Sequence, residues 1–542
     1  MTGTFNLFQK LVFSIALISM SVAASSDLQA QSDKSGTKTK KAVQTRNKSY
    51  QTKIQNFNKA GEQVTRFSTM GEAIDAHDGE IAFFEGVYYL YGTSYGCGFE
   101  WGKKEAPFCG FKTYSSTDLV HWTDRGMLFD PTTPVWQSRC DGSTYGCFRP
   151  HVIFNKKTSN YVLWINVYDN VSGFRVFTSK SPVGPFVEVA EPKLAVNADA
   201  PAAGLNNGDH DTFVDLDGTG YIAYTDWRTK GTIVIEKLSD DYLTGTGEVT
   251  KNITPGKTEA PSVFERNGIY YLTYSDPNCG YCAGTGTSYR TAKTPLGPWS
   301  EGIQISSNSC GGQPSFVSPI QLTSGTVYIY GSDLWNDAAK NEALANFYWA
   351  PLTFAEDGSI LPMSCQNEAE LSLAEGGAGK QKEIKNLDND AGVRNFKTYE
   401  DISHNVQRGQ GFTTTRKGIL NGISVTTFQN GYPDADLVIL LYAADENYLP
   451  IGKPLYSTNI PRDRVSWSPS NITVNPNISV NKGSKYTIVL KSSATKGIYG
   501  FMYHDENTEP NSGASYSSDQ GKNYVIEKNR IIKFRTTIKT RS

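Results

Sequence analysis

The sequence lacks an excess of charge of either sign. Its 542 residues include 52 basic and 54 acidic side chains, which gives a formal net charge of −2. Because nucleic acids and other polyanions are bound by basic surfaces, this balance argues against both classes of partner. The chain is too long for a single hydrophobic core, so we expect two or more domains.

Long hydrophobic runs are also scarce, and the one candidate lies at the N terminus. Lys10 supplies a positive charge, residues 11–24 are mostly apolar, and residues 28–30 read Leu-Gln-Ala. This order predicts a cleaved export signal over residues 1–31. The alternative is an uncleaved anchor, but the run is short and diluted by Ser. No Cys stands at the cleavage point, so we expect an exported protein (periplasmic, cell-surface or extracellular) without lipid anchor or membrane span after signal removal.

Cysteine is infrequent, with eight residues that all lie between positions 97 and 365. Cysteines in an exported chain favour disulfides, although sequence alone does not settle their connectivity. The disulfides that we predict join sequence neighbours: Cys97–Cys109 and Cys140–Cys147. Cys279 and Cys282 could form half of a zinc site, but no second half follows at a suitable spacing, which favours a disulfide there too.

The chain does contain a repeated two-strand unit. Residues 208–226, GDHDTFVDLDGTGYIAYTD, start with acids, continue as an apolar strand, turn at Asp217-Gly218 and leave through a second strand. The same pattern recurs at residues 78–91, 149–164, 259–274 and 313–330. Five repeats of about 40–60 residues, each followed by further strand-like runs, predict a five-bladed β-propeller. The alternative is an ordinary sandwich whose hairpins resemble one another by chance.

Composition divides the chain into segments. Residues 32–60 are rich in Lys, Thr, Gln and Asn, which predicts a flexible linker before a propeller at 61–370. A Gly-rich linker follows at 371–385. Short alternating runs separated by turns predict a β-sandwich accessory domain at 386–542, which either binds sugar or only packs. The expected fold class is therefore all-β, a five-bladed β-propeller followed by a C-terminal β-sandwich.

The innermost strands of a propeller line its central channel, so the residues that begin them meet at one mouth. Here these residues are Asp78, Arg149, Asp209, Glu259 and Gln313. Neighbouring carboxylates repel, so at least one should have a raised pKa and could donate a proton while another stays ionised. With no nucleophilic Ser or Cys elbow, this set favours glycosidic bond cleavage. The alternative is that the acids only cap turns or close the channel.

Aromatic and histidine side chains are expected near this mouth. Loop aromatics could stack on sugar rings or pack between blades: Trp101, Trp136, Trp227, Trp335 and Tyr281. His77, His151 and His210 flank the channel positions and could contact substrate or a cation. They do not form a clear ligand set for a metal.

Six segments, in order, carry a family resemblance. They are DAHDGEIAFFEGVYYLYGTS, YSSTDLVHW, FRPHVIFN, DHDTFVDLDGTGY, TEAPSVFERNGIYYLTYS and GGQPSFV, spread over residues 70–363. This order resembles glycoside hydrolase family 43, which implies a five-bladed propeller and inverting, usually exo-acting hydrolysis of arabinosidic, xylosidic or galactosidic bonds. The resemblance implies Asp78 as general base, Glu259 as general acid, and Asp209 as the residue that orients the acid and modulates its pKa.

Within that family the sequence is similar to the branch that contains exo-β-1,3-galactanases. It departs from the branch at Phe148, where those enzymes carry Glu, and at Asp78, where they tend to carry Gly and a Gln is proposed to help as base. Retention of Asp78 favours an Asp base with Gln313 as a substrate or water contact. Because this Glu is missing, the sequence no longer favours a galactan as substrate over an arabinofuranoside or a galactofuranoside.

The sequence thus predicts a secreted inverting exo-glycoside hydrolase that removes terminal galactose or L-arabinofuranose from plant-type polysaccharide such as arabinogalactan. The expected substrate contacts are Arg149, Gln313, His77, His210 and Trp227. An oligo- or polysaccharide is the expected partner, and no cofactor is required, although the family resemblance allows a structural Ca²⁺ in the channel. The rivals are a non-catalytic carbohydrate-binding propeller and, further off, a polysaccharide lyase. The oligomeric state stays open.

Overall fold

The structure is a computed structural model. It describes residues 49–540 except 102, 104, 137–139, 141–145, 169–172, 197–206, 279, 336–340, 378, 393–394 and 508–510. The expected export signal, the first part of the expected linker (residues 32–48) and Cys279 lie outside the described residues. The residues that are described belong to one compact unit, Asn47–Ser542. In this part of the chain, none of the helices has the length and hydropathy needed to cross a membrane.

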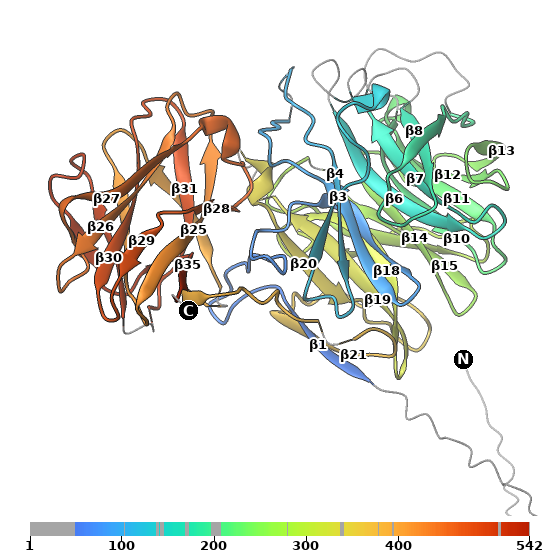
Figure 1. The fold of residues 1–542 in the computed structure, drawn as a ribbon. Coiled ribbons are helices and arrows are strands. Elements are labelled where there is room, and N and C mark those ends of the chain that lie inside the picture. The colour runs from blue at the N-terminus through green and yellow to red at the C-terminus, as the bar shows by residue number, and fades with distance from the viewer. Residues whose placement is uncertain are drawn as a thin grey trace, which may run out of the picture. The chain divides into compact units, whose positions relative to one another are not determined.

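Four consecutive antiparallel sheets of four strands follow one another along the chain (Figure 1). The first contains β2 (His77–Phe84), β3 (Val87–Thr93), β4 (Phe111–Ser116) and β5 (Thr123–Met127). The second contains β6 (Cys147–Asn155), β7 (Asn160–Val167), β8 (Phe174–Ser179) and β9 (Val187–Ala190). The third contains β10 (Asn207–Val214), β11 (Gly220–Asp226), β12 (Thr232–Leu238) and β13 (Gly245–Thr250). The fourth contains β14 (Glu259–Arg266), β15 (Ile269–Ser275), β16 (Thr287–Ala292) and β17 (Ile303–Ser306).

The first hairpin of each sheet depends on its turn residues. Asn267 and Gly268 both have positive φ, 54° and 75°, as a two-residue turn between twisted strands requires. At the expected Asp217-Gly218 turn only Gly218 has positive φ, 86°. The Asp215 amide donates to the Thr219 carbonyl, so this connection is a longer loop than the two-residue turn that we expected.

A fifth sheet combines strands from both ends of this region. It has the order β1 (Tyr50–Gln55), β21 (Glu368–Leu373), β18 (Gln313–Leu322), β19 (Gly325–Leu334) and β20 (Asn346–Pro351). Figure 1 shows β1 beside β21. The expected flexible linker at residues 32–60 is therefore wrong from residue 50 onward. Thr52 and Ile54 are buried between exposed Gln51, Lys53 and Gln55, an alternation that the polar composition hides.

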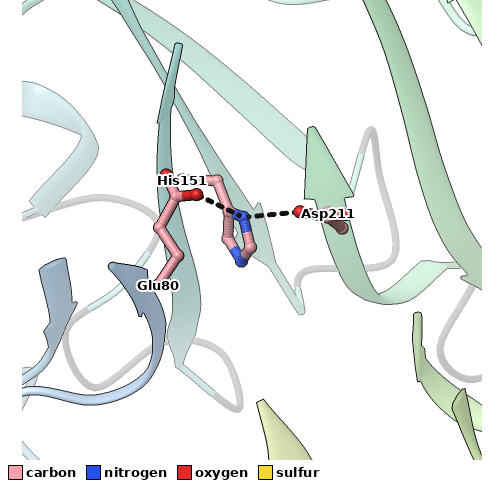
Figure 2. Close-up of side chains that lie close together, drawn as sticks. All are labelled: Glu80, His151 and Asp211. Atoms are coloured by element: carbon pink, nitrogen blue, oxygen red, sulfur yellow. Dashed lines mark ion pairs between the residues drawn. The ribbon is translucent and has the colours of Figure 1, made fainter. Parts of the chain in front are cut away.

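In each of these five sheets one strand begins the hairpin repeat, and we call it the first strand: β2, β6, β10, β14 and β18. The first strands contact one another in a closed circuit, β2 to β6, β6 to β10, β10 to β14, β14 to β18, and β18 back to β2. One side chain on each strand bonds to a neighbouring strand. The bonds are Glu80 to the Val152 amide (2.6 Å), Asp211 to the Val263 amide (2.6 Å), Ser262 to the Val317 amide (2.9 Å), Ser315 to the Gly79 carbonyl (3.1 Å) and His151 to Asp211 (3.1 Å). Figure 2 shows His151 between Glu80 and Asp211. Polar side chains thus join each inner strand to the next.

Apolar side chains fill the space between neighbouring sheets. Between the second and third sheets, for example, Trp164 and Val176 pack with Ile222 and Val234, all fully buried. Each such side chain stabilises the fold by about 1.5–3 kcal/mol relative to exposure. The circuit therefore has a polar inner rim and an apolar outer core.

Residues after the fifth sheet form two further antiparallel sheets around one apolar core. One sheet contains β22 (Leu387–Asp390), β23 (Lys397–Ile402), β25 (Gly418–Asn430), β28 (Ser470–Val474), β29 (Ile478–Val480), β31 (Ile498–His504), β34 (Ile531–Ile532) and β35 (Phe534–Lys539). The other contains β24 (Gln407–Thr413), β26 (Leu437–Ala444), β27 (Pro450–Ile460), β30 (Lys485–Ser492), β32 (Ser512–Ser517) and β33 (Val525–Glu527). Short 3₁₀ helices lie in connections: η2 (Trp227–Thr229), η3 (Glu342–Leu344) and η4 (Arg462–Arg464).

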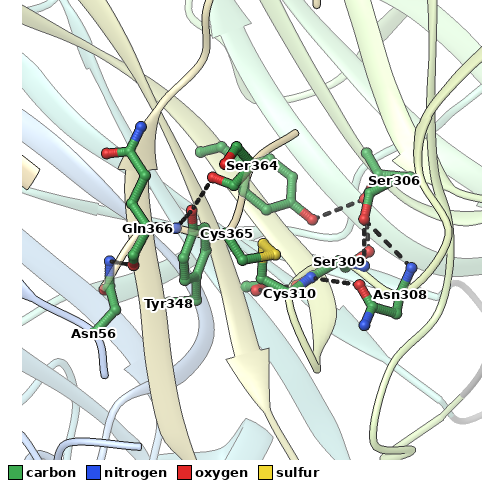
Figure 3. Close-up of a disulfide and its surroundings, with 12 residues drawn as sticks. Asn56, Ser306, Asn308, Ser309, Cys310, Tyr348, Ser364, Cys365 and Gln366 are labelled. Carbon is green, nitrogen blue, oxygen red and sulfur yellow. Dashed lines mark hydrogen bonds between the residues drawn. A yellow bond between two sulfur atoms is a disulfide. The ribbon is translucent and has the colours of Figure 1, made fainter. Parts of the chain in front are cut away.

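Disulfides fix several loops around the inner strands. The predicted pairs Cys97–Cys109 and Cys140–Cys147 are confirmed. A third disulfide, Cys310–Cys365, joins the loop before β18 to the segment before β21 (Figure 3). Its half-cystines are 55 residues apart, so pairing by sequence proximity could not find it. It holds the chain three residues before Gln313, which begins β18.

We predict that Asp211→Ala lowers the free energy of unfolding by about 3–5 kcal/mol, because it leaves His151 and the Val263 amide without their buried acceptor. Asp240→Ala is the matched control, since its exposed ion pair with Lys157 contributes less than about 1 kcal/mol. Urea unfolding followed by tryptophan fluorescence measures both values. An Asp211 variant no less stable than the control would contradict the role of these bonds in closing the circuit.

Candidate active site

The five residues expected at the mouth line one cavity. Asp78, Arg149, Asp209, Glu259 and Gln313 come from the first strands of five different sheets and surround a volume of about 60 Å³. The other residues that line it are Trp101, Phe148, Tyr168, Gly280, Tyr281 and Trp335. The repeat thus correctly predicted that these side chains meet, although they are up to 235 positions apart in the sequence.

A β-bulge lies at or beside the mouth residue in each of the five first strands, where the pairing register shifts. Asp78 and Arg149 have φ values of 52° and 56°, which are unusual for residues with a Cβ. A bulge turns the strand locally and re-aims its side chains. Gly79 is needed beside Asp78, because a Cβ there would lie 2.1 Å from the Tyr91 carbonyl oxygen.

Asp78 is a buried carboxylate held by hydrogen bonds at both oxygens. Thr93 Oγ1 donates to Oδ1 (2.6 Å) and Tyr95 Oη donates to Oδ2 (2.7 Å). Its own amide donates to Asp333 Oδ2 (3.1 Å). Burial raises the pKa of Asp78 to about 6, although Arg149 and the hydroxyl donors oppose this shift. Above that pH, Asp78 is an oriented carboxylate that can accept a proton.

Arg149 supplies the positive charge of the site. Its Nη2 donates to Asp209 Oδ2 at 2.8 Å, and both side chains are buried. Its guanidinium also donates to the Pro314 and Ser315 carbonyls, at 3.4 and 3.3 Å. Burial opposes the charge, but Asp209 and Asp78 together raise the pKa of Arg149. The pair offsets one of the three acidic charges in the cavity.

Glu259 is oriented by a two-step hydrogen-bond chain. Trp335 Nε1 donates to Gln313 Oε1 (3.1 Å), and Gln313 Nε2 donates to Glu259 Oε1 (2.8 Å). Because the indole N–H can only donate, the Gln313 amide must present its NH₂ to the acid. Glu259 Oε1 is then an acceptor, so a proton carried by Glu259 sits on Oε2. Gln313 is therefore a hydrogen-bond donor to the Glu259 carboxyl group.

The cavity is enclosed by aromatic side chains. Trp101, 41% exposed, lies at its rim with its ring centroid 5.6 Å from that of Phe148, 5.9 Å from Tyr168 and 5.8 Å from Tyr281. The last three rings are buried. A volume this small, about that of two water molecules, leaves no space for a polysaccharide chain to pass through.

Three of the expected substrate contacts do not line the cavity: His77, His210 and Trp227. His77 is fully buried and stacks on Phe347 at 4.9 Å, with Nδ1 3.5 Å from Asp333 Oδ1. His210 is fully buried beside His151, and burial lowers its pKa, so it is neutral. Trp227 packs against the aromatic cluster. His77 and His210 each stand next to a mouth residue in a strand, and alternation along the strand turns these two side chains away from the mouth.

Sequence reasoning missed the residues that support Asp78. Thr93 ends β3, Tyr95 follows it, and Asp333 lies near the end of β19 directly opposite Gln313. In each hairpin the second strand ends where the first begins, so its last residues also reach the mouth. Polar residues at the end of each second strand were therefore the sequence signal that could have identified Thr93, Tyr95 and Asp333.

A metal could be considered at Glu80, His151 and Asp211, whose ligand atoms lie within 4.8 Å of one another (Figure 2). Glu80 Oε1 and Asp211 Oδ2 already accept amide N–H groups. Calcium prefers six to eight oxygen ligands, which this set does not provide. Although burial opposes it, Glu80 and Asp211 raise the pKa of His151. The residues therefore fit an internal ion-pair network better than a calcium ion.

Comparison with known proteins gives the same family as the motifs. A sequence model of glycosyl hydrolases family 43 matches residues 72–314. The chain is 26% identical over 299 residues to beta-D-galactofuranosidase xynD of Aspergillus niger, covering 53% of this chain and 82% of that protein. It is 24% identical over 215 residues to an arabinoxylan arabinofuranohydrolase of Bacillus subtilis, covering 34% of this chain and 40% of that protein.

Solved structures of similar fold include an exo-β-1,3-galactanase from Clostridium thermocellum, with 23% identity, a TM-score of 0.49, and coverage of 66% of this chain and 73% of that chain. Another is an exo-β-1,3-galactanase from Phanerochaete chrysosporium, with 20% identity, a TM-score of 0.47, and coverage of 83% of this chain and 100% of that chain. Residues 72–314 therefore match glycosyl hydrolases family 43, and the comparisons support glycoside hydrolase activity.

Proposed function

We propose that the protein is an exported, inverting exo-glycoside hydrolase that removes terminal galactose or L-arabinofuranose units from plant-type polysaccharide such as arabinogalactan. The observation that carries this proposal is the convergence of Asp78 and Glu259, with different hydrogen-bond environments, on one small cavity. The disulfides of the described residues support an oxidising compartment.

The fold that we infer is a five-bladed β-propeller followed by a β-sandwich over residues 386–542. The closed circuit of β2, β6, β10, β14 and β18 supports five blades around a channel. The shared core of the two later sheets supports the sandwich. In this architecture the catalytic cavity lies at one mouth of the channel.

In the proposed reaction Glu259 is the general acid and Asp78 the general base. Glu259 Oε2 gives its proton to the glycosidic oxygen as the bond to the anomeric carbon breaks. Asp78 removes a proton from a water molecule that attacks this carbon from the opposite face, which inverts its configuration. Asp209, paired with Arg149, modulates the pKa of Glu259 and helps to orient it. The scheme uses no cofactor.

The cavity supports action at a chain end. Its volume of about 60 Å³ and its aromatic rim favour one terminal unit over a polymer that passes through. The two sequence relatives are named for removal of galactofuranose and arabinofuranose. These names support a furanose as one of the two proposed substrates.

The proposal is tested by digestion of arabinogalactan, arabinan and β-1,3-galactan, with ¹H NMR of the first product. We expect a single monosaccharide, galactose or L-arabinose, whose first anomer is opposite to that of the bond cleaved. Retention of configuration would overturn the assignment of Asp78 as base, because the water would then not attack directly. Release of oligosaccharides in place of a monosaccharide would overturn the exo assignment.

We predict that Glu259→Gln lowers kcat on natural oligosaccharides by about 10²–10⁴-fold, because the leaving oxygen is no longer protonated. The loss should be much smaller on a dinitrophenyl glycoside, whose leaving group needs no proton. The exposed turn variant Asp217→Asn is the matched control and should keep wild-type rates on both substrates. An equal loss on both substrates would remove Glu259 from the acid role.

The pH dependence of kcat/KM should report the ionisation of Asp78. Since its pKa is about 6 and the base must be ionised, we predict that kcat/KM falls about tenfold per pH unit below pH 6. Thr93→Val removes a hydrogen bond that favours the ionised form, so the acidic limb should shift to higher pH. A limb that stays in place in this variant would show that another group controls it.

A further inference from the structure

A second and larger cavity lies away from the catalytic residues. Its volume is about 870 Å³, and it shares no lining residue with the catalytic cavity. It is lined by side chains of β1 and β35 and by residues 64–67, 71, 120–121, 381–384, 386–387, 390, 392, 395–396, 416 and 533. Its lining is rich in cationic side chains: Lys53, Arg66, Lys382, Arg416, Lys533 and Arg535. Three of these cations already have acidic partners: Lys53 pairs with Glu368 at 2.6 Å, Arg416 with Asp388 at 3.6 Å and Arg535 with Asp390 at 3.1 Å. The lining itself contains two acidic side chains, Glu383 and Asp390.

Lys533 is a buried cation in this lining. Lys533 is only 7% exposed, and its ammonium group donates a hydrogen bond to the Gly71 carbonyl at 2.8 Å. The ammonium lies 5.0 Å from the Phe67 ring centroid and 5.7 Å from that of Phe396. Burial lowers the pKa of Lys533 to about 8. Among the described residues no carboxylate forms an ion pair with Lys533, and Asp390 and Glu72 act on its charge only from a longer distance.

Arg66 also lacks an acidic partner in the described part of the chain. Its Nη2 donates to Asn56 Oδ1 at 2.8 Å, but its Nε is buried without a hydrogen-bond partner. Burial lowers the pKa of Arg66 to about 9. Two cations that stay unpaired at one cavity are costly for the fold unless an anion enters it.

Asn395 adds neutral polar groups that lack partners. Both its Nδ2 and its Oδ1 are buried with no hydrogen bond among the described residues, and the residue lines the cavity. A buried polar atom without a partner costs about 1–3 kcal/mol. An unpartnered donor and acceptor on a residue of the lining match a hydroxyl group, which can both accept and donate.

These features together define the ligand. The cations exclude a metal ion and favour an anion, the amide favours hydroxyl groups, and Phe67, Ile384 and Phe396 provide apolar surface for a ring face. We propose that this cavity binds a hexuronate, the acidic sugar unit of a charged oligosaccharide. Its carboxylate pairs with Lys533, Arg66 and Lys382, its hydroxyls bond to Asn395, and its ring packs on the apolar side chains.

This site is separate from the proposed catalytic function, because it uses none of the catalytic residues. It gives the protein a means of holding an acidic polysaccharide by a unit that it does not cleave. Retention near the substrate raises the effective concentration of chain ends at the catalytic cavity.

Isothermal titration calorimetry of the full chain tests the proposal with sodium D-glucuronate, methyl β-D-glucuronide, D-glucose and inorganic phosphate. We expect both uronates to bind with Kd values of about 1 mM, and glucose at least tenfold more weakly. Binding of free glucuronate but not of the glycoside would overturn the proposal for chain-linked units. Phosphate that displaces glucuronate at equal concentration would show a general anion site and overturn the choice of a hexuronate.

Variants locate the binding. Lys382→Gln changes an exposed residue that lines the cavity, and we expect it to weaken glucuronate binding by about three- to tenfold. Lys385→Gln, an exposed residue of the same segment outside the lining, is the matched control and should bind as wild type. Equal affinities in the two variants would overturn the assignment. Hydrolysis of an aryl glycoside should be unchanged in both, so this test is independent of the proposed reaction.

Discussion

The closed circuit of inner strands is the constraint on which the rest of the structure depends. Each first strand is joined to a neighbour by a side-chain hydrogen bond or ion pair, through Glu80, His151, Asp211, Ser262 and Ser315. These polar groups bridge the first strands around the circuit, while apolar side chains fill the spaces between neighbouring sheets. The loss of one buried partner leaves a donor or a charge uncompensated, so the circuit tolerates little change. The circuit sets the positions of the five side chains that meet at the cavity.

Three carboxyl groups in one cavity repel one another when they are ionised. Each has a different neighbouring group that reduces this electrostatic cost. Asp209 pairs with Arg149, Asp78 receives hydrogen bonds from Thr93 and Tyr95, and Glu259 receives the amide of Gln313. Donors at both oxygens of Asp78 favour its ionised form, whereas the contact at Glu259 Oε1 leaves Oε2 as the position for a proton. The two carboxyl groups thus differ in their hydrogen-bond neighbours, and such a difference is what the proposed acid and base roles require.

Much of the site could be predicted from the sequence because the repeat fixes which residue begins each first strand. Counting from the hairpin turns placed Asp78, Arg149, Asp209, Glu259 and Gln313 together without any long-range information. His77 and His210 were misplaced because they are adjacent to mouth residues in sequence, whereas alternation along a strand turns them away. Thr93 and Asp333 were missed because only the first strand of each hairpin was considered. The pairing of β1 with β21 and the Cys310–Cys365 disulfide join distant segments that carry no shared local pattern, so they could not be read from local composition.

Strain at the bulges links the circuit to the chemistry. Asp78 and Arg149 occupy left-handed backbone conformations that cost of order 1–3 kcal/mol each. The register shifts at these two residues re-aim their side chains, so the strain accompanies the orientation that brings both into the cavity. The Asp333 carboxylate accepts the Asp78 amide and the Pro314 and Ser315 carbonyls accept the Arg149 guanidinium, so each strained residue is bound by another sheet, in both cases the fifth. The conformation that aims the catalytic carboxylate at the cavity can therefore persist only while the circuit is closed. Stability of the fold and geometry of the reaction are consequences of the same set of contacts.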